Sequence, residues 1–215
     1  MKKAVVFDLG GTLMEFKGMP PVWIDYYKTG FDSINAKYNL GLSGDDIEKS
    51  VELMKSYNPR VNYREIEIDA TEIFINATAH WNTELDIVDV IECFFDGINL
   101  DTVIYDYAFE MLESYKSNGY KIACLTDLPN GMPDYIFKKP IQKLIDELDL
   151  YVSSQSCGYR KPNAFGLQYI ADCFDMPVNE LLFIGDEEKD RLTAVNAGCN
   201  FMFIGEIRKN ITDIF

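Results

Sequence analysis

The chain has 215 residues, of which 47% are apolar and 26% are charged, as is ordinary for a soluble globular protein. Its formal net charge of −15 repels the phosphates of nucleic acid and the anionic surface of a membrane, so we expect neither as a partner. No stretch approaches the roughly 20 apolar residues of a membrane-spanning helix, and the length fits one large domain or one domain with an insertion.

The first predicted element is a strand over residues 3–8, in which residues 4–7 form an unbroken apolar run. Such a run is typical of a central strand that is buried on both faces of a parallel sheet. The run stops at Asp8, which is followed by a leucine, two glycines and a threonine. A carboxylate at the end of a buried strand makes this turn a candidate functional site.

A long segment without a convincing buried strand follows, over residues 15–101. Its sequence predicts helices instead, so we expect an all-α insertion here and a core made of residues 1–14 and 102–215. The aromatic residues of the insertion are expected to form mainly its own core, while a few line a substrate pocket. The helices are predicted over residues 20–39, 43–58, 67–82 and 85–98, and the aromatic residues are Trp23, Tyr26, Tyr27, Phe74, Trp81, Phe94 and Phe95.

The rest of the chain alternates between strands and helices. Apolar runs predict four more strands, and helical patterns lie next to them. Such alternation favours an α/β fold with a doubly wound parallel sheet. The strands are predicted over residues 120–127, 148–154, 181–186 and 199–205, and the helices over 101–119, 132–149, 163–176 and 187–198.

The ends of these strands hold the candidate site, because ligands bind beyond the carboxyl ends of the strands in an open parallel sheet. Carboxylates, hydroxyls and glycines gather there, and a lysine lies in the loop after the third strand. The candidates are Asp8, Gly10, Gly11 and Thr12 after the first strand, Thr126 and Asp127 after the second, Lys161 after the third, and Asp186 and Asp190 after the fourth.

These residue types suit the binding and transfer of a phosphoryl group. Three carboxylates in one crevice repel each other and need a cation or shifted pKa values. Mg²⁺, a hard ion that prefers oxygen ligands, is the natural cation. The Lys161 ammonium and the Thr126 hydroxyl are suited to hold an anion, to which the backbone N–H groups of Gly11 and Thr12 are expected to add. A carboxylate is then a candidate nucleophile.

Four short motifs resemble, in order, those of the haloacid dehalogenase (HAD) superfamily, most of whose members are phosphatases. They are DLGGT, LTD, RKP, and GDEEKD followed by AVNAG, and they cover the whole core. The resemblance makes Asp8 the nucleophile, Thr126 the phosphate-binding hydroxyl and Lys161 the cation that neutralises nucleophile and phosphate. It makes Asp186 and Asp190 the metal-binding acids of the site.

The same resemblance implies a HAD-like Rossmannoid, three-layer core with strand order 5-4-1-2-3. It places a C1-type helical cap after the first motif, where the helical insertion lies. Asp8 and the backbone carbonyl of Gly10 are expected to complete the metal ligands, and Asp127 is expected to offer a backbone N–H to phosphate. The implied protein is a cytoplasmic, Mg²⁺-dependent phosphatase that acts on a small phosphorylated metabolite.

Gly10 departs from the family pattern D-x-D-x-T, whose second Asp is the general acid/base. In the family, this Asp protonates the leaving alcohol and then activates the water that hydrolyses the aspartyl-phosphate. Gly10 has no side chain for either step, and a missing general acid/base lowers the rate by about 10²- to 10⁴-fold. Glu15, at the hinge of the insertion, and Asp127 are the candidate replacements.

Three alternative functions stay open. One is a 2-haloacid dehalogenase, a class that lacks the second Asp but works without Mg²⁺. Another is phosphonate cleavage, which uses a cap lysine as a Schiff base and has Lys49 and Lys55 as candidates. The third is a binding or regulatory protein that holds a phosphate ligand without turnover.

Other polar residues are expected to have structural roles. His80, the only histidine, lies in a predicted helix and is expected to pack or to face solvent. Glu187 and Glu188 are expected to be solvated acids at a helix start, with Glu187 a minor candidate for an outer metal contact. Asn130 and Gly131 are expected to form a turn.

The cysteines indicate a reducing compartment, because five of them are scattered without a CxxC pair and predict no disulfide framework. The N-terminal sequence MKKAVVFDLGG carries charges, but its apolar run stops after four residues, which argues against a signal peptide. The cysteines are Cys93, Cys124, Cys157, Cys173 and Cys199.

Overall fold

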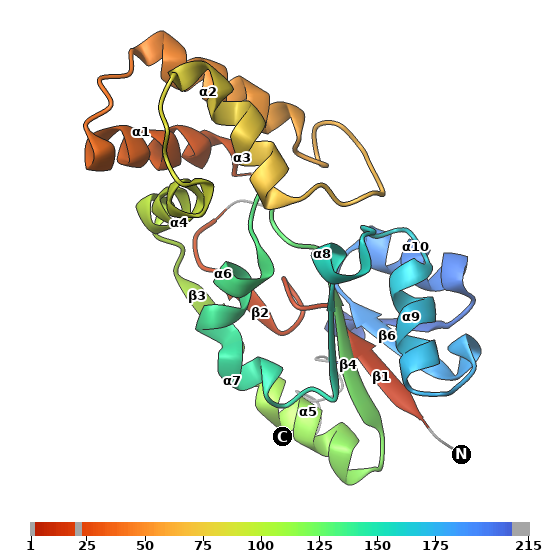
Figure 1. The fold of residues 1–215 in the computed structure, drawn as a ribbon. Helices are drawn as coiled ribbons and strands as arrows, with labels where there is room; N and C mark the ends of the chain where they lie inside the picture. The colour runs from red at the N-terminus through yellow and green to blue at the C-terminus, as the bar shows by residue number, and fades with distance from the viewer. Residues whose placement is uncertain (1–2, 20–22, 208–215) are drawn as a thin grey trace.

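The computed structural model describes residues 3–19 and 23–207, and it has an α/β fold built on a parallel sheet (Figure 1). The five strands lie in the order β5-β4-β1-β6-β7, and every neighbouring pair is parallel. The predicted fold class is confirmed. The strands are β1 (Ala4–Phe7), β4 (Lys121–Thr126), β5 (Leu150–Ser153), β6 (Leu181–Gly185) and β7 (Asn200–Phe203).

The sequence did not predict the second sheet, in which β2 (Met14–Phe16) pairs antiparallel with β3 (Thr102–Ile104). The helix predicted over 101–119 is wrong at its start, because three successive β-branched residues favour a strand there. Its helical part, α5, spans only Ala108–Ser117. Because β2 and β3 belong to the small sheet, the five strands of the parallel sheet are not numbered consecutively. If only these five are numbered along the chain, their order in the sheet is 3-2-1-4-5, which is the expected order 5-4-1-2-3 when it is read from the other edge.

Helices cover both faces of the parallel sheet and give three layers. Side chains alternate along β1, so that Ala4 and Val6 face one side while Val5 and Phe7 face the other. The first side packs against α9 and α10, and the second packs against α5, α6 and α7. The bounds are α6 (Asp134–Lys138), α7 (Gln142–Ile145), α9 (Phe165–Cys173) and α10 (Glu188–Ala197), with a short α8 (Ser154–Cys157) after β5.

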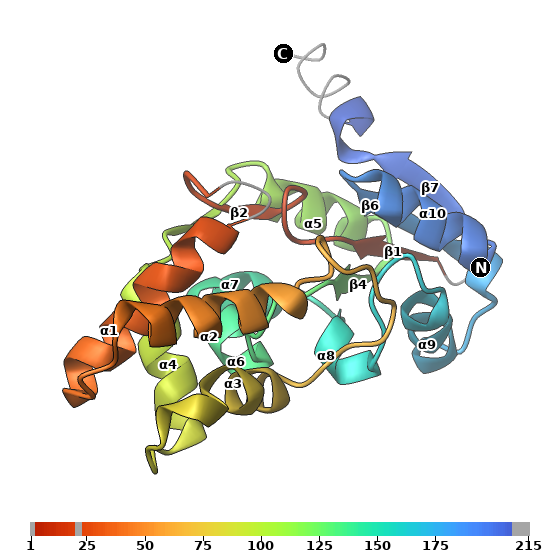
Figure 2. The same cartoon turned by 90° about the horizontal axis from the view of Figure 1, so that it is seen from above.

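Four helices form the segment between β2 and β3 and gather at one end of the molecule, away from α9 and α10 (Figures 1 and 2). They agree with the predicted helices, although the start of the first prediction, at residues 20–22, lies outside the described residues. Their core is aromatic: the ring centroids of Phe31 and Phe74 each lie 5.0 Å from that of Phe94. The helices are α1 (Tyr27–Tyr38), α2 (Gly44–Ser56), α3 (Ala70–Thr78) and α4 (Ile87–Ile98).

Local capping explains where these helices begin and end. The Ser43 side chain accepts the N–H of Asp46 and the Asp46 carboxylate accepts the N–H of Ser43, which makes a capping box at the start of α2. Helices α1 and α4 end on Asn39 and Asn99 in the left-handed conformation, and α10 ends on Gly198 in the same way.

The structure bears on two further expectations, which concern membrane-spanning helices and the cysteines. Within the described residues, no helix is both long and apolar enough to cross a membrane. The five cysteines are all free thiols, as the sequence predicted.

Candidate active site

The carboxyl ends of three neighbouring strands meet at one point. Strand β1 lies between β4 and β6, and its last residue is level with Cys124 on one side and Ile184 on the other. Asp8, Thr126 and Asp186 therefore emerge together at this edge of the sheet. The N–H of Asp8 donates to the carbonyl of Ile184 at 2.8 Å, which fixes the start of the turn.

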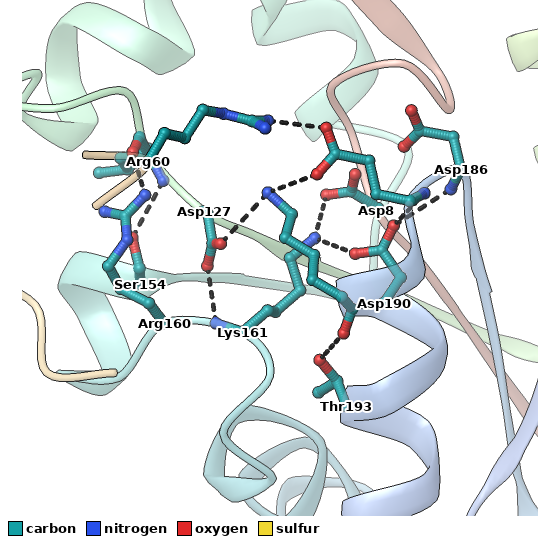
Figure 3. Close-up of polar contacts among 12 residues, drawn as sticks. Asp8, Arg60, Asp127, Ser154, Arg160, Lys161, Asp186, Asp190 and Thr193 are labelled. Carbon is teal, nitrogen blue, oxygen red and sulfur yellow. Dashed lines mark hydrogen bonds and ion pairs between the residues drawn. The ribbon is translucent and has the colours of Figure 1, made fainter. Parts of the chain in front are cut away.

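The Lys161 ammonium lies between two of the acids (Figure 3). Its Nζ is 2.7 Å from Asp8 Oδ1 and 2.6 Å from Asp190 Oδ1, and all three side chains are buried. Burial lowers the pKa of Lys161, but the neighbouring Asp190 and Asp8 outweigh burial, so that the pKa is raised overall. Lys161 is therefore a permanent positive charge beside Asp8.

The acids at this point outnumber the lysine. Carboxylate oxygens of Asp8, Asp186 and Asp190 lie within 4.8 Å of one another. Burial raises the pKa of Asp8 to about 7, against the opposing effect of Lys161. Burial, followed by the charges of Asp190 and Glu187, also raises the pKa of Asp186. A cation with oxygen ligands would stabilise the ionised form of these carboxyl groups.

Asp190 links the lysine to the start of α10. One of its carboxylate oxygens contacts Lys161, and the other accepts the N–H groups of Asp186 at 3.1 Å and Glu187 at 2.9 Å. Both oxygens are thus already engaged. Asp190 therefore fixes the position of Lys161 and of the loop that carries Asp186.

The glycine turn after β1 approaches Asp186 closely. A Cβ at Gly11 would lie 2.2 Å from Asp186 Oδ2, and the φ of Gly11 is +80°, so only glycine fits. The Thr12 hydroxyl donates to Asp186 Oδ1 at 3.3 Å. The N–H groups of Gly11 and Thr12 donate to the carbonyls of Met14 and Leu9. This corrects the expected phosphate contact, because these amides close the turn while the two residues position Asp186.

The position that lacks the family's second acid is open. A Cβ built at Gly10 meets no atom within 4 Å, and the φ of Gly10 lies outside the left-handed region. A Cβ is therefore accommodated at this position without a clash or backbone strain.

The two expected replacements for the missing acid differ in their surroundings. Asp127 accepts the N–H of Lys161 at 3.0 Å and lies 3.5 Å from Lys189 Nζ. Burial raises its pKa, but the nearby cations and this hydrogen bond outweigh burial and lower it, so Asp127 is held ionised. Glu15 is exposed and accepts the Tyr105 hydroxyl at 3.1 Å. Both residues line the cavity, but Glu15 is the more exposed of the two, and only Asp127 is fixed between cations.

A cavity of about 480 Å³ opens from these strand ends towards the helical segment. Its lining includes Asp8, Thr126 and Lys161 from the core. The neighbouring loop after β4 is fixed because Leu128 accepts Arg160 at 2.9 Å and donates to the Ser154 hydroxyl at 3.0 Å. The helical segment contributes Trp23, Tyr27, Asn58, Arg60, Tyr63 and Arg64 to the lining, which agrees with the expectation that a few of its aromatic residues reach a pocket.

Several lining residues were missed by the sequence analysis. Arg60 and Arg64 lie in the loop between two helices, where no motif distinguishes them from surface cations. Asn130, expected only in a turn, is buried and lines the cavity. The residues missed are Tyr27 as a polar group, Arg60, Arg64, Tyr105, Asn130, Arg160 and Lys189.

The remaining candidates lie outside the cavity lining. His80 Nε2 contacts the carbonyl of Asp46 at 2.9 Å, so the histidine packs within the helical segment, as expected. Lys49 is exposed, and Lys55 pairs with Glu52 at 3.1 Å on the surface of α2. None of the three lines the cavity.

The fold and this cluster define an α/β protein with a candidate site for a cation and an anion. The sequence model of the haloacid dehalogenase-like hydrolases matches residues 2–198. The chain belongs to the haloacid dehalogenase-like hydrolase family.

Known proteins of this family resemble the chain over different lengths. A phosphoglycolate phosphatase of Aliivibrio fischeri is 25% identical over 92% of this chain and 82% of the relative. Another, of Pasteurella multocida, is 32% identical over 49% of this chain. The chain spans about half the length of the first curated relatives it matches, at 47%, 45% and 53%.

Solved structures of low sequence identity share the fold. A 2-haloacid dehalogenase of Pseudomonas syringae has a TM-score of 0.68 at 19% identity, covering 94% of this chain and 86% of the other. A predicted phosphoglycolate phosphatase of Haemophilus somnus has a TM-score of 0.53 at 20% identity, covering 93% and 84%. At these identities, the likeness concerns the fold alone.

The position of Asp190 leads to a test of stability. Asp190→Ala removes one of the two acids of the buried Lys161 and leaves two N–H groups without acceptors. We expect the free energy of unfolding to fall by about 3–5 kcal/mol, as for other broken buried ion pairs. Asp190→Asn keeps an acceptor for the amides and should be less destabilising. Urea denaturation measures both changes.

Glu188→Ala is the matched control, because Glu188 lies in the same helical turn but forms only an exposed pair with Arg191. We expect no measurable change in its urea midpoint. Equal midpoints for Asp190→Ala and Glu188→Ala would contradict the role given to Asp190.

Proposed function

We propose that this protein is a Mg²⁺-dependent phosphatase that hydrolyses a small phosphorylated metabolite through a phosphoaspartyl group on Asp8. The observation that carries the proposal is the contact of 2.7 Å between Lys161 and Asp8, at the mouth of three converging strands. A carboxylate paired with a buried lysine can act on an anionic substrate, because the lysine offsets the charge that the substrate brings.

The residues present fit a magnesium ion. Their donor atoms are all oxygens, from the carboxylates of Asp8 and Asp186 and the backbone carbonyl of Gly10, and Mg²⁺ prefers such ligands. Asp190 lies beside this set, although its oxygens already hold Lys161 and two amides. When bound, the ion withdraws charge from the phosphoryl group during transfer.

In the proposed reaction, Asp8 attacks the phosphorus and the bond from phosphorus to the leaving oxygen breaks. Lys161 offsets the negative charge of the phosphoryl oxygens, and the Thr126 hydroxyl and the N–H of Asp127 donate hydrogen bonds to them. Water then cleaves the aspartyl-phosphate, which releases inorganic phosphate and restores Asp8. Because Gly10 has no side chain, the departing oxygen takes its proton from water or from a group such as Glu15.

The names of the relatives suggest the first substrate to assay. Several are phosphoglycolate phosphatases, so 2-phosphoglycolate heads the panel. Phosphonate cleavage through a cap lysine has less support, because Lys49 and Lys55 lie outside the cavity lining. A protein that only binds phosphate would release none from any member of the panel.

The nucleophile is tested with Asp8→Asn, which keeps the side-chain shape but removes its charge. We expect phosphate release from 2-phosphoglycolate and p-nitrophenyl phosphate to need Mg²⁺, and to fall to background in Asp8→Asn because an amide cannot replace the proposed carboxylate nucleophile. A phosphate-release assay with Mg²⁺ or with a chelator measures this. Full activity of Asp8→Asn would mean that another group attacks the phosphorus.

Gly10 leads to a second prediction, about leaving groups. Without a general acid, acetyl phosphate and p-nitrophenyl phosphate should be cleaved much faster than an alkyl phosphate, because their leaving groups are weak bases. Gly10→Asp should raise the rate on the alkyl phosphate by up to about 10²- to 10⁴-fold and narrow this gap. Steady-state rates on the three substrates measure it.

Gly10→Ala is the control for shape, because it adds a Cβ without a carboxyl group, in space that the structure leaves open. Its rates should match those of the native protein. If the native protein cleaves alkyl and aryl phosphates equally fast, another residue already supplies the proton, and Glu15→Gln should then slow the alkyl substrate.

A further inference from the structure

Buried polar atoms without partners gather at one wall of the cavity. Among the described residues, four buried side-chain nitrogen or oxygen atoms have no hydrogen-bond partner. Three of these atoms, Nε and Nη1 of Arg64 and Oδ1 of Asn130, belong to residues that line the cavity. Enclosed polar atoms of this kind are rare in folded proteins and call for an explanation.

Arg64 also shares the acid that it pairs with, Glu67, with a second arginine. Its Nη2 lies 3.2 Å from Glu67 Oε1, but the other oxygen of Glu67 pairs with Arg160. By contrast, Arg60 lies 2.7 Å from Glu187, and Lys189 contacts both Asp127 and Glu187. The guanidinium groups of Arg64 and Arg160 thus share the carboxylate of Glu67, and Asp127 is a further negative charge near both.

The backbone holds Arg64 in place relative to the phosphoryl end of the cavity. Ile66 and Tyr159 form an antiparallel bridge, in which the N–H of Glu67 donates to Gly158 at 2.9 Å and the N–H of Arg160 donates to Glu65 at 2.8 Å. The loop with Arg64 is therefore joined to the loop with the catalytic lysine. An anion at Arg64 and a phosphoryl group at Lys161 would occupy the same cavity at a fixed separation.

Asn130 adds an acceptor to the same wall. Its Nδ2 donates to the carbonyl of Met54 at 3.1 Å and to the Tyr27 hydroxyl at 3.3 Å. The Tyr27 hydroxyl also accepts Asn58 at 2.8 Å. These contacts fix the amide and leave Oδ1 without a donor, so the wall has unpaired polar groups of both kinds.

We infer that Arg64 is the centre of a second anion subsite, which binds a negative group on the part of the substrate that leaves. The ligand class is a phosphorylated compound with a second anionic group, a carboxylate or a second phosphoryl group. The inference rests on the proposed function, since it takes the first phosphoryl group to lie at Asp8 and Lys161. The side chain of Arg64 is 15% exposed and lines the cavity, so it is within reach of a ligand there.

Binding of phosphonates, which carry no cleavable ester bond, tests the subsite without turnover. The probes are 3-phosphonopropionate, its neutral amide and propane-1,3-bisphosphonate, each titrated with Mg²⁺ by calorimetry. We expect the native protein to bind a probe with a second anionic group at least about 10-fold more tightly than the amide, as for a charge-assisted pair. Whichever of 3-phosphonopropionate and the bisphosphonate binds more tightly shows whether the second anionic group of the ligand is a carboxylate or a phosphoryl group.

Arg64→Met keeps the length of the side chain and removes its charge. It should abolish the preference for the probes with a second anionic group while leaving affinity for the amide within about 3-fold. Its urea midpoint should equal or exceed that of the native protein, because Glu67 keeps Arg160 as its partner; a purely structural arginine would lower it. Arg64→Lys should restore part of the preference.

Arg60→Met is the matched control, since Arg60 lies in the same loop and pairs with Glu187, while Lys189, the other cation at Glu187, has Asp127 as a second acid. It should keep the preference. Equal affinity of the native protein for all three probes would overturn the subsite alone, as would a preference that survives in Arg64→Met. Failure of every phosphonate to bind would overturn the phosphoryl site at Asp8 and the subsite together.

Discussion

One buried ion cluster determines how the rest of this molecule is arranged. Lys161 lies between Asp8 and Asp190 with almost no exposure to water, and charges buried in this way must be paired and hydrogen-bonded to be tolerated. The parallel register of β1 and β6 brings Asp8 beside the loop of Asp186. The start of α10 supplies the amides that fix Asp190, and the loop of Lys161 is joined to the helical segment. Fold and site therefore depend on the same contacts.

The turn after β1 keeps the residues that position the acids but lacks the aspartate that would transfer protons. Gly11 and Thr12 keep Asp186 close and oriented, so the acids remain together where the proposed function places a cation. Gly10 leaves an open space where the general acid/base of the family would lie. Under the proposed function, attack by Asp8 proceeds as in the family, whereas both proton-transfer steps are slowed. The chemistry of the substrate's leaving group then decides the rate, and the residues along the cavity decide which leaving groups fit.

The sequence was sufficient for the parts that depend on local patterns. Apolar runs predicted the strands. Because parallel strands bring their carboxyl ends together, the sequence also predicted that Asp8, Asp186 and Lys161 lie close to one another. It was insufficient where tertiary contacts decide. The amides of Thr12 and its neighbour were expected to bind phosphate, but turn geometry directs them to backbone carbonyls. Arg64 looked like any surface cation, because only the pairing of distant loops encloses it.

The phosphoaspartyl group itself gives the most direct test of this account. The native protein is mixed with Mg²⁺ and acetyl phosphate, quenched in acid during turnover and digested for mass spectrometry. Because Gly10 provides no base to activate water, the account predicts that the aspartyl-phosphate accumulates, with one phosphoryl group on the peptide that contains Asp8 and none in Asp8→Asn. Turnover without a phosphoryl group on that peptide, or with one on another peptide, would contradict it.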